Sequence, residues 1–252
     1  MPGLEHLQIE ESHSLEEVYA FLTRTGLGDG LPVIPPTERR VQAMLAGRDP
    51  VQVVAHLEPA RGAATHRALA QCAVMAGCIP EQLPVLIAAA RALADPAFNL
   101  LGVQTTTGNT AVLLLVSGPV VTRLRFNGGG NALGPGNHAN ATLGRALGFA
   151  LRNIGGAVPG KRDMATQGQP AKYTCCCAEN EPASPWGSLA TARGAPLGQS
   201  VATLFAISGL VEVMDVSSTP EGVLTTLARS MTIAGTVGGA GLLGSGEPLL
   251  LL

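Results

Sequence analysis

One pattern occurs three times along the chain and limits the fold more than any other feature. An apolar run with high β-propensity is followed by a polar or glycine-rich loop and then by a helical segment that ends at glycine; the units cover residues 51–77, 111–156 and 201–235. Near-continuous apolar strands that alternate with helices indicate a sheet covered by helices. We therefore predict the α/β class, with a diverged β-α repeat as one interpretation and chance recurrence of the pattern as the other.

The expected elements divide the chain into two parts. Residues 1–45 read as an N-terminal arm, with a helix over 14–25 that Ser14 and Glu17 can cap and a proline-rich extended stretch after it. Residues 46–252 read as the α/β domain. Its predicted strands are residues 51–57, 100–107, 111–117, 201–208 and 249–252, and its predicted helices are residues 65–76, 80–93, 140–154 and 220–234. The last apolar strand either closes this domain's own sheet or pairs with a partner chain that completes it.

Composition excludes several classes of function. The net charge of −2 and the aromatic content of 3% argue against binding to nucleic acid or to an anionic membrane. No uninterrupted apolar run reaches the roughly 18 residues of a membrane span. Five cysteines without a secretion signal predict reduced thiols in the cytoplasm. Only 13% of residues are charged, so we expect another subunit, in a hetero- or homo-oligomer, to cover part of the surface; a compact enzyme with few charged loops is the alternative.

A loop rich in glycine and asparagine leads directly into the predicted helix of the second unit. Glycines let backbone N–H groups turn toward a ligand, and the start of a helix favours negative charge. Arg145, one turn into that helix, could clamp a carboxylate or phosphate. The alternative is a purely structural crossover loop, and the motif of neither a P-loop nor a dinucleotide site is present, so no cofactor is predicted. The candidate substrate-binding residues here are Asn131, Gly134, Gly136, Asn137, Asn140 and Arg145.

Three adjacent thiols, at residues 175–177, make up the second candidate site. Cys176 is the expected nucleophile or redox thiol, Glu179 an expected acid or base, and Asn180 an amide contact for the substrate. His138 in the glycine-rich loop is the most plausible imidazole for proton transfer, and Asp29 is a further candidate for substrate binding. Alternatively, the thiols fill space beneath a loop and the histidine is structural. No metal site is predicted, because no cysteine or histidine spacing matches a known pattern.

Several strings together resemble a poorly characterised bacterial family associated with UGSC-motif proteins, which are selenoprotein-type and carry thioredoxin-like labels. These strings are residues 29–37, 74–78, 131–136, 139–147 and 178–186. The resemblance implies that Cys176 corresponds to the family's lone cysteine, within a register of one residue, and that Cys78 is a second redox candidate. It also implies that a Cys-Gly-Ser-Cys partner motif, and the part of the family beyond Leu252, would lie on another chain.

Three functional hypotheses follow. The first is a cytoplasmic enzyme subunit that acts on a small polar or anionic molecule by cysteine-dependent nucleophilic or thiol-redox chemistry. The second is a non-catalytic subunit that completes a partner's active site. The third is a cofactor-independent lyase or hydrolase that uses carboxylates and backbone amides.

Overall fold

A computed structural model describes residues 4, 7 and 9–231 of the chain. The chain divides into two compact units, residues 1–207 and residues 208–252. The predicted strand at residues 249–252 and the end of the helix predicted over residues 220–234 lie outside the described residues. This division differs from the boundary expected after residue 45.

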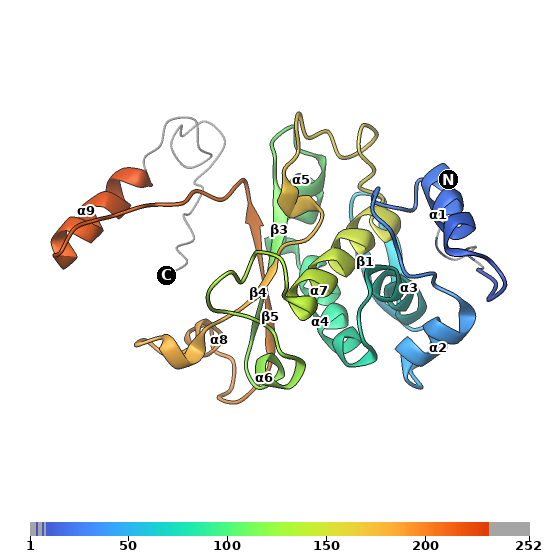
Figure 1. Ribbon diagram of the computed structural model, residues 1–252, viewed down its shortest axis with the longest axis horizontal. Helices are drawn as coiled ribbons and strands as arrows, with labels where there is room; N and C mark the ends of the chain where they lie inside the picture. Colours follow the sequence, from blue (N-terminus) through green and yellow to red (C-terminus); the bar gives the residue numbers. More distant parts are fainter. Residues whose placement is uncertain (1–3, 5–6, 8, 232–252) are drawn as a thin grey trace. The chain divides into compact units, whose positions relative to one another are not determined.

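The larger unit holds a three-stranded sheet in the order β4-β3-β5 (Figure 1). The central strand β3 (Ala111–Ser117) pairs in parallel with β4 (Cys176–Ala178) and antiparallel with β5 (Val201–Ile207). All seven residues of β3 are buried, because its sequence AVLLLVS presents apolar side chains to both faces of the sheet. This strand has the bounds predicted from the sequence.

A separate two-stranded hairpin contains the strand of the first predicted unit. Strand β1 (Val53–Leu57) pairs antiparallel with β2 (Gly62–Thr65), and neither strand joins the central sheet. Gly62 is required where β2 meets the chain at Ile154, because a Cβ there would lie 1.9 Å from the Ile154 carbonyl oxygen. The strand of the first predicted unit therefore lies in a different sheet from β3 and β5, the strands of the other two units.

Nine α-helices lie within the described residues, and the four that end at Thr25, Leu45, Ala76 and Leu93 end where the sequence predicts. The Ser14–Glu17 capping box is present, and Gly26 and Gly77 end their helices with positive φ. The helices are α1 (Leu15–Thr25), α2 (Glu38–Leu45), α3 (His66–Ala76), α4 (Leu83–Leu93), α5 (Leu100–Thr105), α6 (Val120–Leu124), α7 (His138–Phe149), α8 (Leu189–Ala192) and α9 (Pro220–Ser230).

The strand predicted at residues 100–107 is wrong, because this segment forms helix α5. The side chain of Asn99 accepts a hydrogen bond from the Gly102 N–H and caps the helix. Leu100 and Gln104, four residues apart, are both buried on the same side of this helix. The helix predicted over 140–154 begins earlier, at His138, and its last five residues, Ala150–Ile154, are π-helical.

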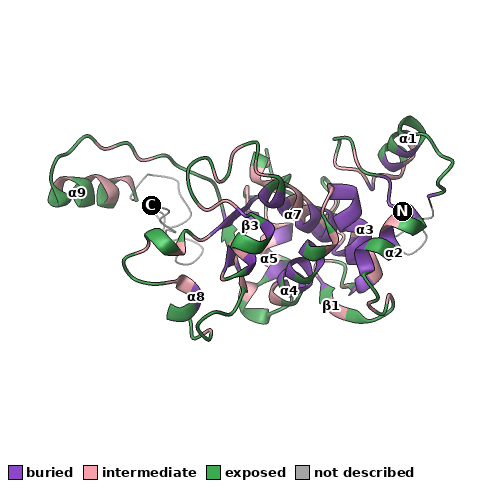
Figure 2. Cartoon of the chain, turned by 60° about the horizontal axis from the view of Figure 1, so that its bottom comes forward, coloured by how far each residue is buried: buried purple, intermediate pink, exposed green. Residues whose placement is uncertain are grey.

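Helices α3, α4 and α7, whose many buried residues are purple in Figure 2, cover one face of the central sheet, and loops with the short helix α8 cover the other. Helices α3, α4 and α7 pack with Leu114, Val116 and Cys176 in the main core, which Val41 and Leu45 of α2 also join. The proposed N-terminal arm is therefore part of this core. The second face holds a small cluster under Ala132, Ala171 and Leu189 of α8, and its buried members are Ala111, Leu113, Leu115, Cys175, Cys177 and Ile207. The fold is thus mixed α/β, with two small sheets packed against helices.

Among the described residues, no single helix is long and apolar enough to cross a membrane. The bent pair Pro80–Leu93 and Pro96–Thr105 meets the length and composition criteria, with 75° between its halves. Seven of the eleven residues of α4 in this pair are buried inside the protein.

Gly144 allows α7 to approach the thiol strand closely, and we expect Gly144→Ala to lower the free energy of unfolding by about 1–3 kcal/mol through overpacking. A Cβ there would lie 2.4 Å from Thr174 Oγ1 and 2.9 Å from the Cys175 nitrogen. Replacement of glycine by alanine would by itself stabilise a helix by about 1 kcal/mol, so a net loss of stability must come from the close contact. Urea unfolding measures the change, with Gly130→Ala as the control because its Cβ meets nothing within 4 Å. A G144A protein as stable as the wild type would contradict the interpretation.

Candidate functional site

The predicted glycine-asparagine loop holds itself together through its own side-chain amides. Asn137 Nδ2 donates to the carbonyl oxygens of Asn131 at 2.7 Å and Gly134 at 3.1 Å. Asn140 Nδ2 donates to the Asn127 and Ala132 carbonyls at 2.8 and 2.9 Å. These amides therefore fix the loop and are not directed at a ligand.

Two glycines of this loop have structural roles, and the histidine after it begins helix α7. A Cβ on Gly134 would lie 1.9 Å from Asn131 Oδ1, and Gly136 has a φ of 95° that side chains rarely adopt. His138 is the exposed first residue of α7, and its carbonyl accepts the Thr142 hydroxyl at 2.8 Å. The backbone turn thus explains both glycines without reference to a substrate.

The loop lies directly beside the segment that follows the thiols. The Ala178 N–H donates to the Asn127 carbonyl at 2.9 Å, and a Cβ on Gly128 would lie 2.6 Å from the Ala178 oxygen. Ala132 packs against the cluster that contains Cys175 and Cys177. The structure therefore brings the two predicted regions together, with the loop covering two of the thiols.

The three adjacent thiols are buried, and alternate ones face opposite sides of β4. Cys176 lies in the main core with 3% of its surface exposed, and burial raises its pKa well above the ordinary range. Burial likewise raises the pKa of Cys175 and of Cys177 to about 11. Cys78 is half-buried after α3, and burial raises its pKa to about 12 against the opposing effect of the Thr142 hydroxyl. None of these environments favours a thiolate near neutral pH.

The carboxylates after the thiols bind backbone and hydroxyl groups at the end of β3. Ser117 Oγ donates to Glu179 Oε2 at 2.6 Å, and the Leu189 N–H donates to Glu179 Oε1. The Gly118 N–H donates to Glu181 Oε1. Asn180 is exposed between them. Glu179 thus joins the end of β3 to α8, a structural contact that the sequence does not suggest.

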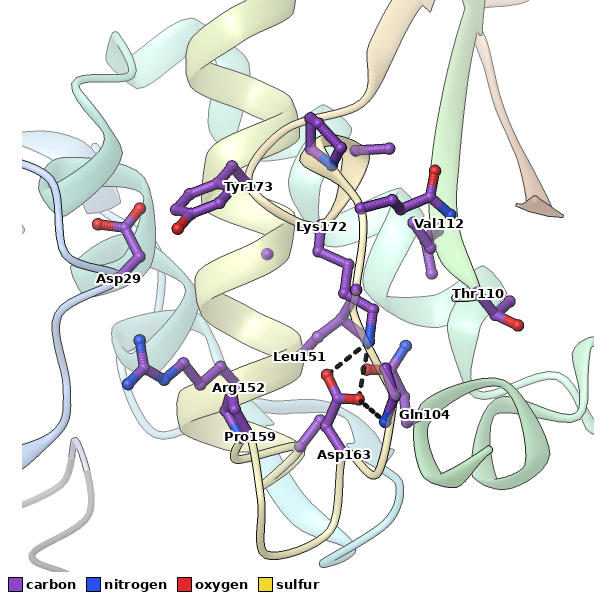
Figure 3. A pocket seen from close by; sticks show the side chains of 18 of the residues that line it. Asp29, Gln104, Thr110, Val112, Leu151, Arg152, Pro159, Asp163, Lys172 and Tyr173 are labelled. Carbon is purple, nitrogen blue, oxygen red and sulfur yellow. Dashed lines mark hydrogen bonds and ion pairs between the residues drawn. The ribbon is translucent and has the colours of Figure 1, made fainter. Parts of the chain in front are cut away.

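A cavity of about 560 Å³ lies at the other end of the strands, where β3 begins and the chain approaches β4 (Figure 3). Its walls come from α7 and the π-helical turn, the loop of residues 157–173 and the start of β3. Of the predicted site residues, only Asp29 and Arg145 line it. None of the five cysteines, all of which lie within the described residues, lines it.

Two ion pairs stand in the wall of this cavity. Arg145 binds Asp29 through both Nε, at 2.8 Å from Oδ2, and Nη2, at 2.9 Å from Oδ1. Arg145 Nη2 also donates to the Leu31 and Pro32 carbonyls, at 3.3 and 2.9 Å. Lys172 Nζ lies 2.7 and 2.6 Å from the two carboxylate oxygens of Asp163. The Asp29–Arg145 contact joins two predicted substrate-binding residues to each other.

Arg152 is the third cation of the cavity, and it has no carboxylate partner among the described residues. Its Nη1 donates to the Gly28 carbonyl, but its Nε is buried without a hydrogen-bond partner. Burial lowers the pKa of this guanidinium, while the charge of Asp29, and that of Tyr173 once it is ionised, act to raise it. A buried donor without a partner is costly, and an anion would satisfy it.

Sequence reasoning missed the charged cavity residues Arg152, Asp163, Lys172 and Tyr173. Arg152 follows Arg145 by seven positions along one continuous helical path, a spacing that places both on the same helix face. Lys172 is one of only two lysines in the sequence. Asp163, the partner of Lys172, lies nine residues before it, whereas the Gly28 carbonyl that Arg152 contacts comes from a distant segment.

No group of three potential metal ligands occurs among the described residues. No protein-family model, no curated protein and no solved structure matches the chain. The resemblance to the UGSC-associated family remains an expectation.

We expect the thiols of residues 175–177 to resist alkylation in the folded protein. A pKa of about 11 for Cys175 and Cys177, against an ordinary 9.0, lowers their thiolate fraction roughly 100-fold at pH 7. Iodoacetamide labelling mapped by mass spectrometry, with and without urea, measures this protection. Rapid labelling of Cys176 in the folded protein would contradict it.

The same pKa shifts predict a pH dependence of stability. Between pH 9 and 11 the unfolded thiols ionise while the folded ones keep their protons, so the unfolded state is favoured as the pH rises. The free energy of unfolding should therefore fall across this window, and less so in a Cys175→Ser/Cys177→Ser protein.

Proposed function

We propose that this protein binds a small anionic molecule in the cavity beside α7 and that Arg152 is the group that binds the anion. The observation that carries this proposal is the buried Arg152 Nε without a hydrogen-bond partner. The two other cations of the cavity are each paired with a carboxylate, so they attract an added anion less strongly than Arg152 does. The volume of about 560 Å³ is in the usual range of about 300–1,000 Å³ for small-molecule sites.

We further propose that the protein is an enzyme subunit, working in the cytoplasm as the sequence leads us to expect. Tyr173, Lys172 and Asp163 beside Arg152 are groups that can donate or accept protons. This arrangement favours the cofactor-independent lyase or hydrolase hypothesis over cysteine-dependent chemistry, because no cysteine lines the cavity. Thiol chemistry at Cys176 stays a prediction for which the folded structure offers no opening.

Replacement of Arg152 tests the binding proposal. Calorimetric titration with small carboxylates, phosphate and sulfate at fixed ionic strength should give saturable binding of at least one anion to the wild type. Arg152→Gln should weaken that binding by about 10- to 100-fold, the effect of losing a charged hydrogen bond.

Arg91→Gln is the matched control, because Arg91 is an exposed arginine of α4 away from the cavity. Equal affinity of the wild type and R152Q proteins for every anion, with both folded by circular dichroism, would refute the proposal.

A second proposal concerns assembly, and its support is the edge strand β5. Its sequence VATLFAI contains no charge and no proline, the features with which edge strands usually prevent pairing. Beyond its ladder with β3, the described residues supply one hydrogen bond to it, from Gln169 Nε2 to the Ile207 carbonyl. Leu204 and Phe205, on opposite faces, are only partly buried. We propose that β5 pairs with β5 of a second copy of the chain.

A charge on this edge should prevent the association. We expect the wild type to sediment as a dimer at micromolar concentrations and Ala206→Lys to sediment as a monomer, because Ala206 is the exposed residue of β5. Ala206→Thr, which keeps β-propensity and adds no charge, should remain dimeric. A monomeric wild type at 100-fold higher concentration would refute the proposal.

A further inference from the structure

We infer that the ligand of this cavity is a monocarboxylate with an apolar body. The inference rests on the proposed function and adds the charge, the geometry and the polarity of the ligand. Three features of the described residues support it: the balance of charges in the wall, the free edge of one guanidinium, and the apolar part of the lining.

The charge balance sets the charge of the ligand. The lining holds three cations and two carboxylates, which leaves one positive charge at neutral pH. A ligand with one negative charge neutralises the cavity, whereas a dianion would bring a second charge with no partner. Burial of an uncompensated charge is strongly unfavourable. The cavity therefore favours a monoanion over phosphate or a dicarboxylate.

The geometry of Arg152 favours a carboxylate. A guanidinium binds a carboxylate through Nε and Nη2, which point the same way, and Arg145 binds Asp29 through these atoms. In Arg152 the Nη1 atom is bonded to the Gly28 carbonyl, while the edge formed by Nε and Nη2 has no partner among the described residues. The neighbouring ion pair thus illustrates the contact that the ligand would make at Arg152.

Part of the cavity lining is apolar. Val112 of β3 and Leu147 and Leu151 of α7 and its π-helical turn contribute side chains, and Ala157 and Pro159 lie on the loop beyond. The side-chain amide of Gln169 could otherwise donate a hydrogen bond to the ligand, but it donates to the carbonyls of Asn109 and Ile207. Burial of an apolar body against this part of the lining would add to affinity at about 25 cal/mol per Å².

Five probes that differ in charge or in size test the inference on the full chain by calorimetric titration. These probes are hexanoate, hexanamide, acetate, succinate and inorganic phosphate. We expect hexanoate to bind at least tenfold more tightly than each of the others, because hexanamide lacks the charge, acetate lacks the body, and the last two carry a second charge. Arg152→Gln should remove this preference. Arg152→Lys keeps the positive charge but lacks the two parallel N–H donors of a guanidinium, so it should weaken hexanoate binding about tenfold.

The outcomes separate the inference from the proposed function. If phosphate or succinate binds as tightly as hexanoate and R152Q abolishes that binding, the inference is wrong and anion binding at Arg152 stands. If acetate or hexanamide equals hexanoate, the inference is wrong as well. If no probe loses affinity in a folded R152Q or R152K protein, both the inference and the proposed function are wrong.

Discussion

The close approach of α7 to β4 at Gly144 is the contact on which the rest of the larger unit depends. It lets the helix backbone lie against Cys175 and Cys176 with no side chain between them. The start of α7 receives the asparagine-rich loop, its middle packs on Cys176, and its last turns form a wall of the cavity. A shift of this one helix would alter all three regions together, because a packed interior transmits displacement.

The two ends of β3 differ in what their polar groups contact. At its carboxyl end, Ser117 and Gly118 bind the carboxylates of Glu179 and Glu181, so these polar groups are satisfied within the protein. At its amino end the lining charges include Arg152, with one donor left over. Ligands of open α/β sheets usually bind at the carboxyl ends of strands. The proposed site lies instead at the amino end of β3, where Arg152 keeps an unpartnered donor, and it therefore differs from the site predicted from motifs near residue 179.

Local sequence patterns predicted the local structure well. Strand β3, the Ser14 cap and the glycine stop at Gly77 depend on residues within a few positions of one another, and their rules are simple. The segment at residues 100–107 was misassigned because its cap, Asn99, has an uncommon positive φ for a residue that is not glycine. The candidate site was harder to predict. Whether an arginine is paired or unpaired depends on contacts across more than a hundred residues, as Arg145 and Asp29 illustrate with a separation of 116.

The Asp29–Arg145 bridge has a consequence for how ligand charge is selected. Asp29 belongs to the segment that follows α1, and it neutralises a guanidinium of a helix that lies far along the chain. At the proposed site, removal of that carboxylate would leave two guanidinium groups of the lining without a carboxylate partner, and we expect a doubly charged molecule to bind better there. Under this proposal, the choice between singly and doubly charged molecules depends on a residue near the N-terminal end, remote in sequence from the helix that carries Arg145.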